Sequence, residues 1–91
     1  MLSSFFLLIL IVVMGSQNTI ASLNVNGLNN KVKQLQLINF MKYHKITILL
    51  VQEHNIRDSN LISQELNDFC EIILNPAVAH KGGTAIFIDR K

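Results

Sequence analysis

The chain has 91 residues, of which 49% are hydrophobic, and its formal net charge at pH 7 is only +2. This length holds one small domain at most, or part of a larger one, and so small a charge neither favours nor excludes a polyanionic partner. The single cysteine, Cys70, excludes an intrachain disulfide and a disulfide-stapled secreted fold, and its apolar neighbours predict a small buried side chain.

Residues 1–18 form a hydrophobic leader that differs from the rest of the chain. The leader contains an unbroken apolar run over residues 5–14 and no lysine or arginine. A membrane span needs about 20 apolar residues, so the run is too short for a stable span but has the length of a signal-peptide hydrophobic region. Val13 and Gly15 fit the small-residue positions of a cleavage site. Two interpretations stay open, a signal peptide or a chance extension of a domain that begins near Thr19.

The chain after the leader follows the pattern of an α/β domain. Residues 19–26 alternate between two faces, which predicts a half-buried strand, and Gly27 ends it. The next apolar residues recur at helical spacing, which predicts a helix over about 30–44 that is capped by Asn29 or Asn30.

The predicted helix has one apolar face that should pack against the core. Its buried stripe is expected to contain Val32, Leu35, Leu37, Ile38, Phe40 and Met41. Its water-facing side is expected to contain Lys31, Lys33, Gln34 and Lys42.

Three further strands are expected after this helix. Residues 46–52 contain a continuous apolar run rich in β-branched residues, which predicts a strand covered on both faces and adjacent to the first strand. Residues 69–75 and 84–89 predict two more strands, the second entered through the hairpin-like turn at glycines 82–83. Because strands alternate with helices and then follow one another, a layered α/β sandwich is favoured.

Polar residues outside the predicted strands and the long helix are interpreted as a helix cap and as surface residues. A loop after the second strand leads into a short helix, for which Ser59 or Asn60 is the expected N-cap. The three histidines, His44, His54 and His80, are interpreted as surface residues.

Asn24 and Glu53 stand at the ends of two neighbouring predicted strands. Their side chains are therefore expected to meet at one edge of the sheet. A carboxylate is a suitable ligand for Mg²⁺, and an asparagine amide beside it can donate a hydrogen bond to a phosphate. The alternatives are that Glu53 is only solvated and that Asn26, which precedes a glycine, only turns the chain.

The strings LNVNGL, then QE at the end of an apolar strand, and later GGTAIF occur in this order along the chain. This pattern resembles the opening of the endonuclease/exonuclease/phosphatase superfamily, most closely the apurinic-type endonuclease domain of non-LTR (LINE-type) retrotransposons. The resemblance covers about residues 19–91. It implies the N-terminal part of a four-layered α/β sandwich like that of deoxyribonuclease I, and an enzyme that nicks DNA with Mg²⁺ or Mn²⁺.

The resemblance also implies roles for three residues. Asn24 matches the asparagine of the first active-site motif, and Glu53 matches the glutamate that binds the divalent metal, so both are candidate catalytic and metal-binding residues. Asn26 stands where the cellular repair enzymes carry an aspartate, and it is the candidate substrate-binding residue.

The other catalytic motifs of the superfamily, a tyrosine, an Asp-x-Asn pair, a further aspartate and a Ser-Asp-His segment, would lie beyond Lys91. Residues 19–91 are therefore expected to be a truncated endonuclease domain of retrotransposon origin that is inactive as a fragment, with DNA as the partner of the parent domain. Two alternatives stay open, a secreted phosphodiesterase or phosphatase of the same superfamily and a non-functional retroelement remnant. The expected location is nuclear for a parent retroelement protein and extracellular if the leader is a signal peptide.

Overall fold

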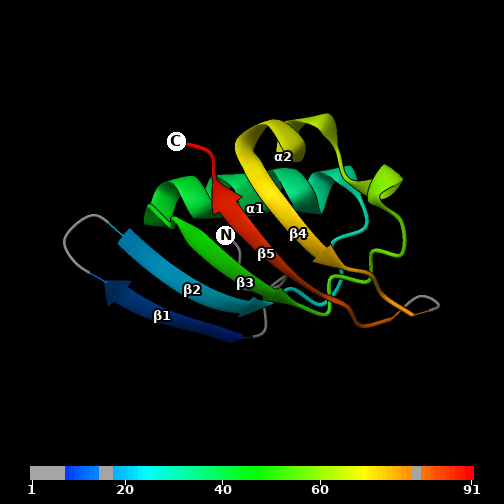
Figure 1. Ribbon diagram of the computed structural model, residues 1–91, viewed down its shortest axis with the longest axis horizontal. Helices are drawn as coiled ribbons and strands as arrows, with labels where there is room; N and C mark the ends of the chain where they lie inside the picture. Colours follow the sequence, from blue (N-terminus) through cyan, green and yellow to red (C-terminus); the bar gives the residue numbers. More distant parts are fainter. Residues whose placement is uncertain (1–7, 15–17, 79–80) are drawn as a thin grey trace.

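Five strands form one mixed sheet in the computed structural model, which describes residues 8–14, 18–78 and 81–91 (Figure 1). The strand order is β1-β2-β3-β5-β4; β2 and β3 are parallel, and the other neighbouring pairs are antiparallel. The chain is thus a mixed α/β protein, as predicted. The strands are β1 (Leu8–Met14), β2 (Asn18–Asn24), β3 (Ile48–Gln52), β4 (Cys70–Asn75) and β5 (Thr84–Asp89). The helices are α1 (Lys31–His44), the 3₁₀ turn η1 (Ser59–Leu61) and α2 (Gln64–Phe69).

The predicted order of the elements after the leader is confirmed. Each of the four strands expected after the leader lies within two residues of its predicted bounds, and α1 begins directly after its cap. The cap is Asn30 rather than Asn29, since the Asn30 side chain accepts the Lys33 N–H at 2.9 Å. The expected adjacency of the first two of these strands is also confirmed, because β2 pairs with β3 from Ile20 opposite Ile48 to Asn24 opposite Gln52.

Part of the hydrophobic leader belongs to the sheet. Strand β1 pairs with β2 in antiparallel register, from Leu8 opposite Asn24 to Met14 opposite Asn18, and it forms the edge next to β2 (Figure 1). Cleavage of residues 1–15 as a signal peptide stays a prediction. Within the described ranges, no helix is long and apolar enough to cross a membrane.

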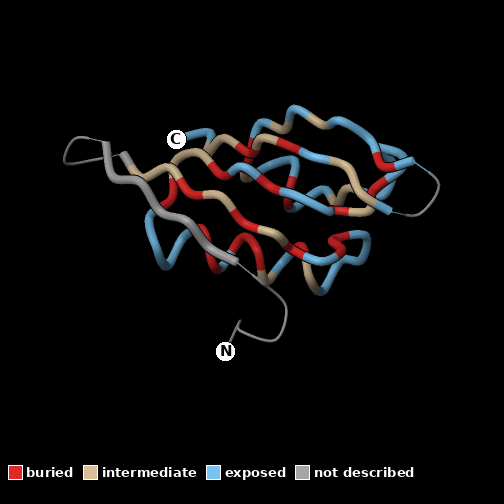
Figure 2. The backbone as a smooth tube through the Cα atoms, turned by 90° about the horizontal axis from the view of Figure 1, so that it is seen from below, coloured by how far each residue is buried: buried red, intermediate tan, exposed pale blue. Residues whose placement is uncertain are grey.

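The two helices lie on one face of the sheet, and the core lies between them and the strands (Figure 1). Buried and more exposed residues alternate along β3 and β5 (Figure 2). In β3, Leu49 and Val51 are buried while Leu50 is 40% exposed. The prediction that this strand is covered on both faces is therefore wrong for the chain as it folds here, because both helices pack on the same side.

The buried face of α1 differs from the predicted stripe. Leu37, Ile38, Phe40 and Met41 are buried, but Val32 is 64% exposed and Leu35 is 38% exposed. Gln34, which was expected to face water, is fully buried. Its side-chain nitrogen donates to the carbonyls of Leu28 (2.9 Å) and Leu61 (2.8 Å), and its oxygen accepts the Ser63 N–H at 2.7 Å. Burial of the amide is favourable because it bonds main-chain groups of two segments outside the helix.

The short helix also begins later than predicted. Ser63, not Ser59 or Asn60, is the N-cap of α2, and its hydroxyl accepts the Leu66 N–H at 3.1 Å. Ser59 and Asn60 belong to η1, which is capped by Asp58. The polar stretch thus forms two short turns with separate caps, a division that cap preference alone does not reveal.

Candidate functional site

Asn24 and Glu53 lie at the same end of the sheet. Asn24 is the last residue of β2 and is paired with Gln52, the last residue of β3, and Glu53 follows directly. Because β2 and β3 are parallel, their carboxyl ends meet at one edge, where ligand sites of open α/β sheets are commonly found.

Main-chain hydrogen bonds continue past the ends of these two strands. The Val25 N–H donates to Gln52 O at 3.1 Å, Gly27 N–H to Glu53 O at 2.7 Å, and Leu28 N–H to His54 O at 2.7 Å. The two loops after β2 and β3 are therefore joined by main-chain hydrogen bonds, and the position of Glu53 depends in part on the loop that contains Asn26.

The loop after β2 turns sharply at Asn26 and Gly27. Asn26 has φ +52° and Gly27 has φ +96°, and the Asn24 side-chain oxygen accepts the Asn26 N–H at 3.1 Å. Lys33 of α1 supports the loop, because its ammonium donates to the carbonyls of Val25 (3.3 Å) and Asn26 (3.0 Å), and partial burial lowers the pKa of Lys33. The oxygen of Asn24 is thus engaged in a turn, and no described residue accepts a hydrogen bond from its amide nitrogen.

A polar hollow of about 370 Å³ lies beside this turn. Its lining consists of Asn26, Glu53, Asn55, Lys81 and Gly82. The structure therefore brings together two of the three predicted site residues, Asn26 and Glu53. Asn24 is at the same edge of the sheet but does not line the hollow.

Two residues of the hollow, Asn55 and Lys81, are not among the site residues predicted from the sequence. The Asn55 side-chain oxygen accepts the Gly82 N–H at 2.9 Å, and the Asn55 N–H donates to Gly82 O at 2.8 Å. These contacts join segments 27 residues apart. The only local signals were the polarity of Asn55 two residues after the glutamate and the position of Lys81 before a glycine pair.

His54 is buried, so its interpretation as a surface residue is wrong. Its exposed fraction is 0%, and both of its ring nitrogens have polar contacts. The main-chain polar groups around the ring make burial favourable, because they replace the hydrogen bonds that water would provide. His44 is exposed as predicted, and His80 lies outside the described residues.

The donors in the hollow suit a hard divalent cation. Mg²⁺ is commonly held by one or two carboxylates together with waters and phosphate oxygens, and Glu53 supplies one carboxylate. The amide of Asn26 adds a neutral oxygen donor. Glu53 is exposed, and the described parts of the chain contain no cluster of three or more His, Cys, Asp or Glu side chains around it or elsewhere. One carboxylate with amide oxygens implies weak binding in which water and substrate fill most of the coordination sphere.

No family model matches the chain, and a comparison with curated proteins also finds no match. The likeness to the endonuclease/exonuclease/phosphatase superfamily therefore rests on the three sequence blocks and on the chemistry of their residues.

Proposed function

We propose that residues 19–91 form the N-terminal part of a metal-dependent DNA endonuclease domain of the non-LTR retrotransposon type. The observation that carries the proposal is the shared polar hollow of Glu53 and Asn26, at the sheet edge where Asn24 ends its strand. These are the three residues that the resemblance assigns to the metal and the substrate.

Each group has a defined part in binding a phosphodiester. Glu53 offers the carboxylate that would hold Mg²⁺ or Mn²⁺, and the bound cation would neutralise charge on the phosphoryl oxygens. The amide nitrogen of Asn24, which no described residue accepts from, and the amide of Asn26 can donate to phosphate oxygens without adding charge. Lys81 adds one ammonium to the rim of the hollow, which favours an anionic ligand.

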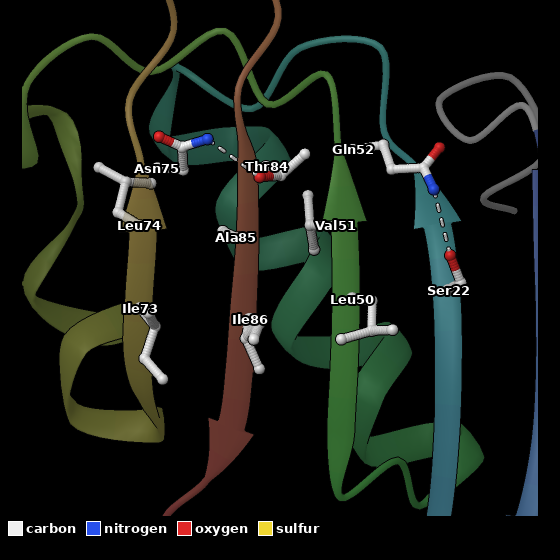
Figure 3. A pocket seen from close by; sticks show the side chains of 10 residues that line it. All are labelled: Ser22, Leu50, Val51, Gln52, Ile73, Leu74, Asn75, Thr84, Ala85 and Ile86. Carbon is white, nitrogen blue, oxygen red and sulfur yellow. Dashed lines mark hydrogen bonds between the residues drawn. The ribbon is translucent and has the colours of Figure 1, made fainter.

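The face of the sheet that the described helices leave open supports the proposal that this unit belongs to a four-layered sandwich. Three apolar side chains, Leu50, Ile86 and Ile73, stand in one row across β3, β5 and β4 on the face away from the helices (Figure 3). Leu50 is 40% and Ile73 is 54% exposed. A second sheet packed on this face would bury the row, as in sandwiches of stacked sheets.

The proposal is tested by locating Mn²⁺ on the 91-residue chain by NMR. Paramagnetic broadening should centre on the amides of Asn26, Glu53, Asn55 and Gly82, because these residues surround the hollow. Glu53→Gln should remove the broadening. Glu71→Gln is the matched control, because Glu71 is an exposed carboxylate near the other end of β4 and its loss should change nothing.

Broadening centred elsewhere, or broadening that survives Glu53→Gln, would contradict the metal assignment. With the metal site established, a short DNA duplex added with Ca²⁺ should shift the side-chain amide signals of Asn24 and Asn26. Unchanged amide signals at saturating DNA would contradict the substrate assignment.

We expect no plasmid nicking by the 91-residue chain with Mg²⁺. Water must be activated by a general base, and the described residues lining the hollow include no histidine and no second carboxylate. An assay of supercoiled plasmid, with Glu53→Gln beside the wild type, checks this. Nicking that requires both Mg²⁺ and Glu53 would show that the chain holds a base that we have not identified.

A further inference from the structure

His54 lies at the centre of the loops that form the polar edge of the sheet. It follows Glu53 directly, and its side chain is fully buried. Its Nε2 lies 3.0 Å from the carbonyl oxygen of Asn75, at the end of β4, and 3.1 Å from that of Thr84, at the start of β5. Its Nδ1 lies 2.8 Å from the main-chain nitrogen of Ile56.

These partners assign the tautomer of the ring. Carbonyl oxygens only accept hydrogen bonds, so Nε2 carries a proton and shares it between Asn75 and Thr84. The Ile56 N–H only donates, so Nδ1 is unprotonated. His54 is therefore neutral, and each of its nitrogens has one role that no apolar side chain of the same size can fulfil.

Packing holds the ring in one place. A Cβ atom added at Gly83 would stand 2.4 Å from Cε1 and 2.6 Å from Nε2 of His54, so the glycine main chain lies directly against the ring. The same Gly83 accepts the Glu53 N–H through its carbonyl at 2.8 Å. The ring and the main chain of the glutamate thus contact the same residue of the neighbouring loop.

The main chain of Glu53 needs this support. Its φ is +56°, a region that residues other than glycine rarely adopt. Its carbonyl accepts the Gly27 N–H at 2.7 Å, and the next turn continues with Asn55 at φ +62°. A left-handed conformation of this kind persists only where surrounding contacts hold it.

We infer that His54 is the positioning residue of Glu53, and that it acts through the Nε2–H bridge to the ends of β4 and β5. The bridge adds a side-chain link from the Glu53 loop to the ends of β4 and β5, beside the main-chain bonds of Glu53 to Gly83 and of Asn55 to Gly82. It thereby stabilises the loop conformation on which the place of the carboxylate depends. The consequence for metal binding rests on the proposed function, whereas the consequence for the conformation of the loop does not.

Two variants of the full chain separate the contacts of the ring. In His54→Asn, the side-chain oxygen stands near the place of Nδ1 and still accepts from Ile56, but the side chain is too short to reach Asn75 and Thr84. In His54→Gln, the terminal amide nitrogen reaches the place of Nε2 and keeps the bridge.

The first measurement is amide hydrogen exchange at Glu53 and Asn55, whose N–H groups donate to Gly83 and Gly82. The Ile46 N–H, which donates to Met41 O at the far end of the sheet, is the reference. We expect exchange about tenfold faster at both residues in His54→Asn, no change at Ile46, and wild-type rates in His54→Gln.

Wild-type rates in His54→Asn, or an acceleration that includes Ile46 equally, would overturn the inference. If His54→Asn does not fold, the exchange rates of His54→Gln test the inference. Wild-type exchange at Glu53 and Asn55 in that variant supports the bridge, and faster exchange there refutes it.

The second measurement is the Mn²⁺ affinity, read from broadening of the Asn26 amide. It should fall about tenfold in His54→Asn and stay unchanged in His54→Gln. Equal affinity in both variants would refute the link between the bridge and the metal. If the wild type binds no Mn²⁺, the proposed function fails, and the exchange rates still decide the positioning role.

Discussion

At the scale of single residues, the two adjacent glycines before β5 share a positive φ but differ in the space around them. Gly82 and Gly83 both have positive φ, +85° and +87°, so an alanine at either position is strained. A Cβ at Gly82 would meet nothing within 4 Å, whereas at Gly83 it would meet the His54 ring and, at 3.0 Å, the Ala77 main-chain nitrogen. Alanine variants at the two positions therefore share the main-chain strain, but only the variant at Gly83 adds a steric clash.

We expect Gly83→Ala to lower the free energy of unfolding by about 2 kcal/mol more than Gly82→Ala. The excess arises because the His54 ring has no room to move away from the new methyl group. Urea unfolding of both variants measures it. Equal losses in the two variants would mean that the ring moves aside easily, contrary to the packing described above.

The only cysteine is buried in the core, as predicted from its neighbours. Cys70 has no exposed surface, its Sγ lies 3.8 Å from the Met41 sulfur, and burial, together with the charge of Asp89, raises the pKa of the thiol to about 12 from an ordinary value of 9.0. In the unfolded chain the thiol ionises near its ordinary pKa, so the folded state binds more protons between these two values.

Stability should therefore fall as the pH rises above about 9, where the unfolded thiol begins to ionise, and the loss from this group should be about 1 kcal/mol at about pH 10. Urea unfolding at neutral pH and near pH 10 measures the change. Cys70→Ala is the control, since its loss of stability over the same range should be smaller. An identical pH dependence in the two proteins would show that the thiol ionises equally in both states.

At the scale of elements, the buried side-chain amide of Gln34 connects α1 to the loop before it and to the segment that precedes α2. Gln34 bonds three main-chain groups, of Leu28, Leu61 and Ser63, so α1 is joined to the loop after β2 and to the start of α2. Gln36 is a natural comparison on the same helix, because it is half-buried and no described residue bonds its side-chain oxygen.

We expect Gln34→Met to lower the free energy of unfolding by about 3 kcal/mol, because it leaves three main-chain groups without a partner in the protein interior. Gln36→Met should be neutral or slightly stabilising, since it removes an unpaired buried oxygen. Chemical denaturation of both variants checks the difference. Equal stability of the two would mean that water replaces the bonds of Gln34.

At the scale of the whole molecule, the residues that the structure describes cover one face of the sheet only. The row of Leu50, Ile86 and Ile73 borders a hollow of about 380 Å³ on the open face (Figure 3). Apolar surface of this kind favours association when no other layer covers it.

We expect the chain to self-associate through this face as its concentration rises, and Leu50→Lys to shift it toward the monomer. Leu61→Lys is the matched control, because Leu61 is exposed to nearly the same extent, 41% against 40%, but belongs to η1 and not to the sheet. Sedimentation velocity over a concentration series measures the effect. A wild type that is monomeric throughout, or an equal effect of both substitutions, would contradict the role of the face.

The sequence by itself determined the order of the elements after the leader and the edge of the sheet where Asn24 and Glu53 stand. Both follow from local rules, since alternation of apolar residues defines a strand and parallel neighbours end at the same edge. The burial of Cys70 was also predictable, because its apolar neighbours lie beside it in the chain.

Only the tertiary structure decided which polar residues are buried and which of the candidates share a hollow. Gln34 bonds partners up to 29 residues away, and His54 bonds carbonyls 21 and 30 residues away. A polar side chain is buried where hydrogen-bond partners from distant segments satisfy it. Local periodicity and propensity do not reveal where those distant partners will lie. For the same reason Asn55 and Lys81 join Glu53 at the hollow, because the contact of two distant loops places them there.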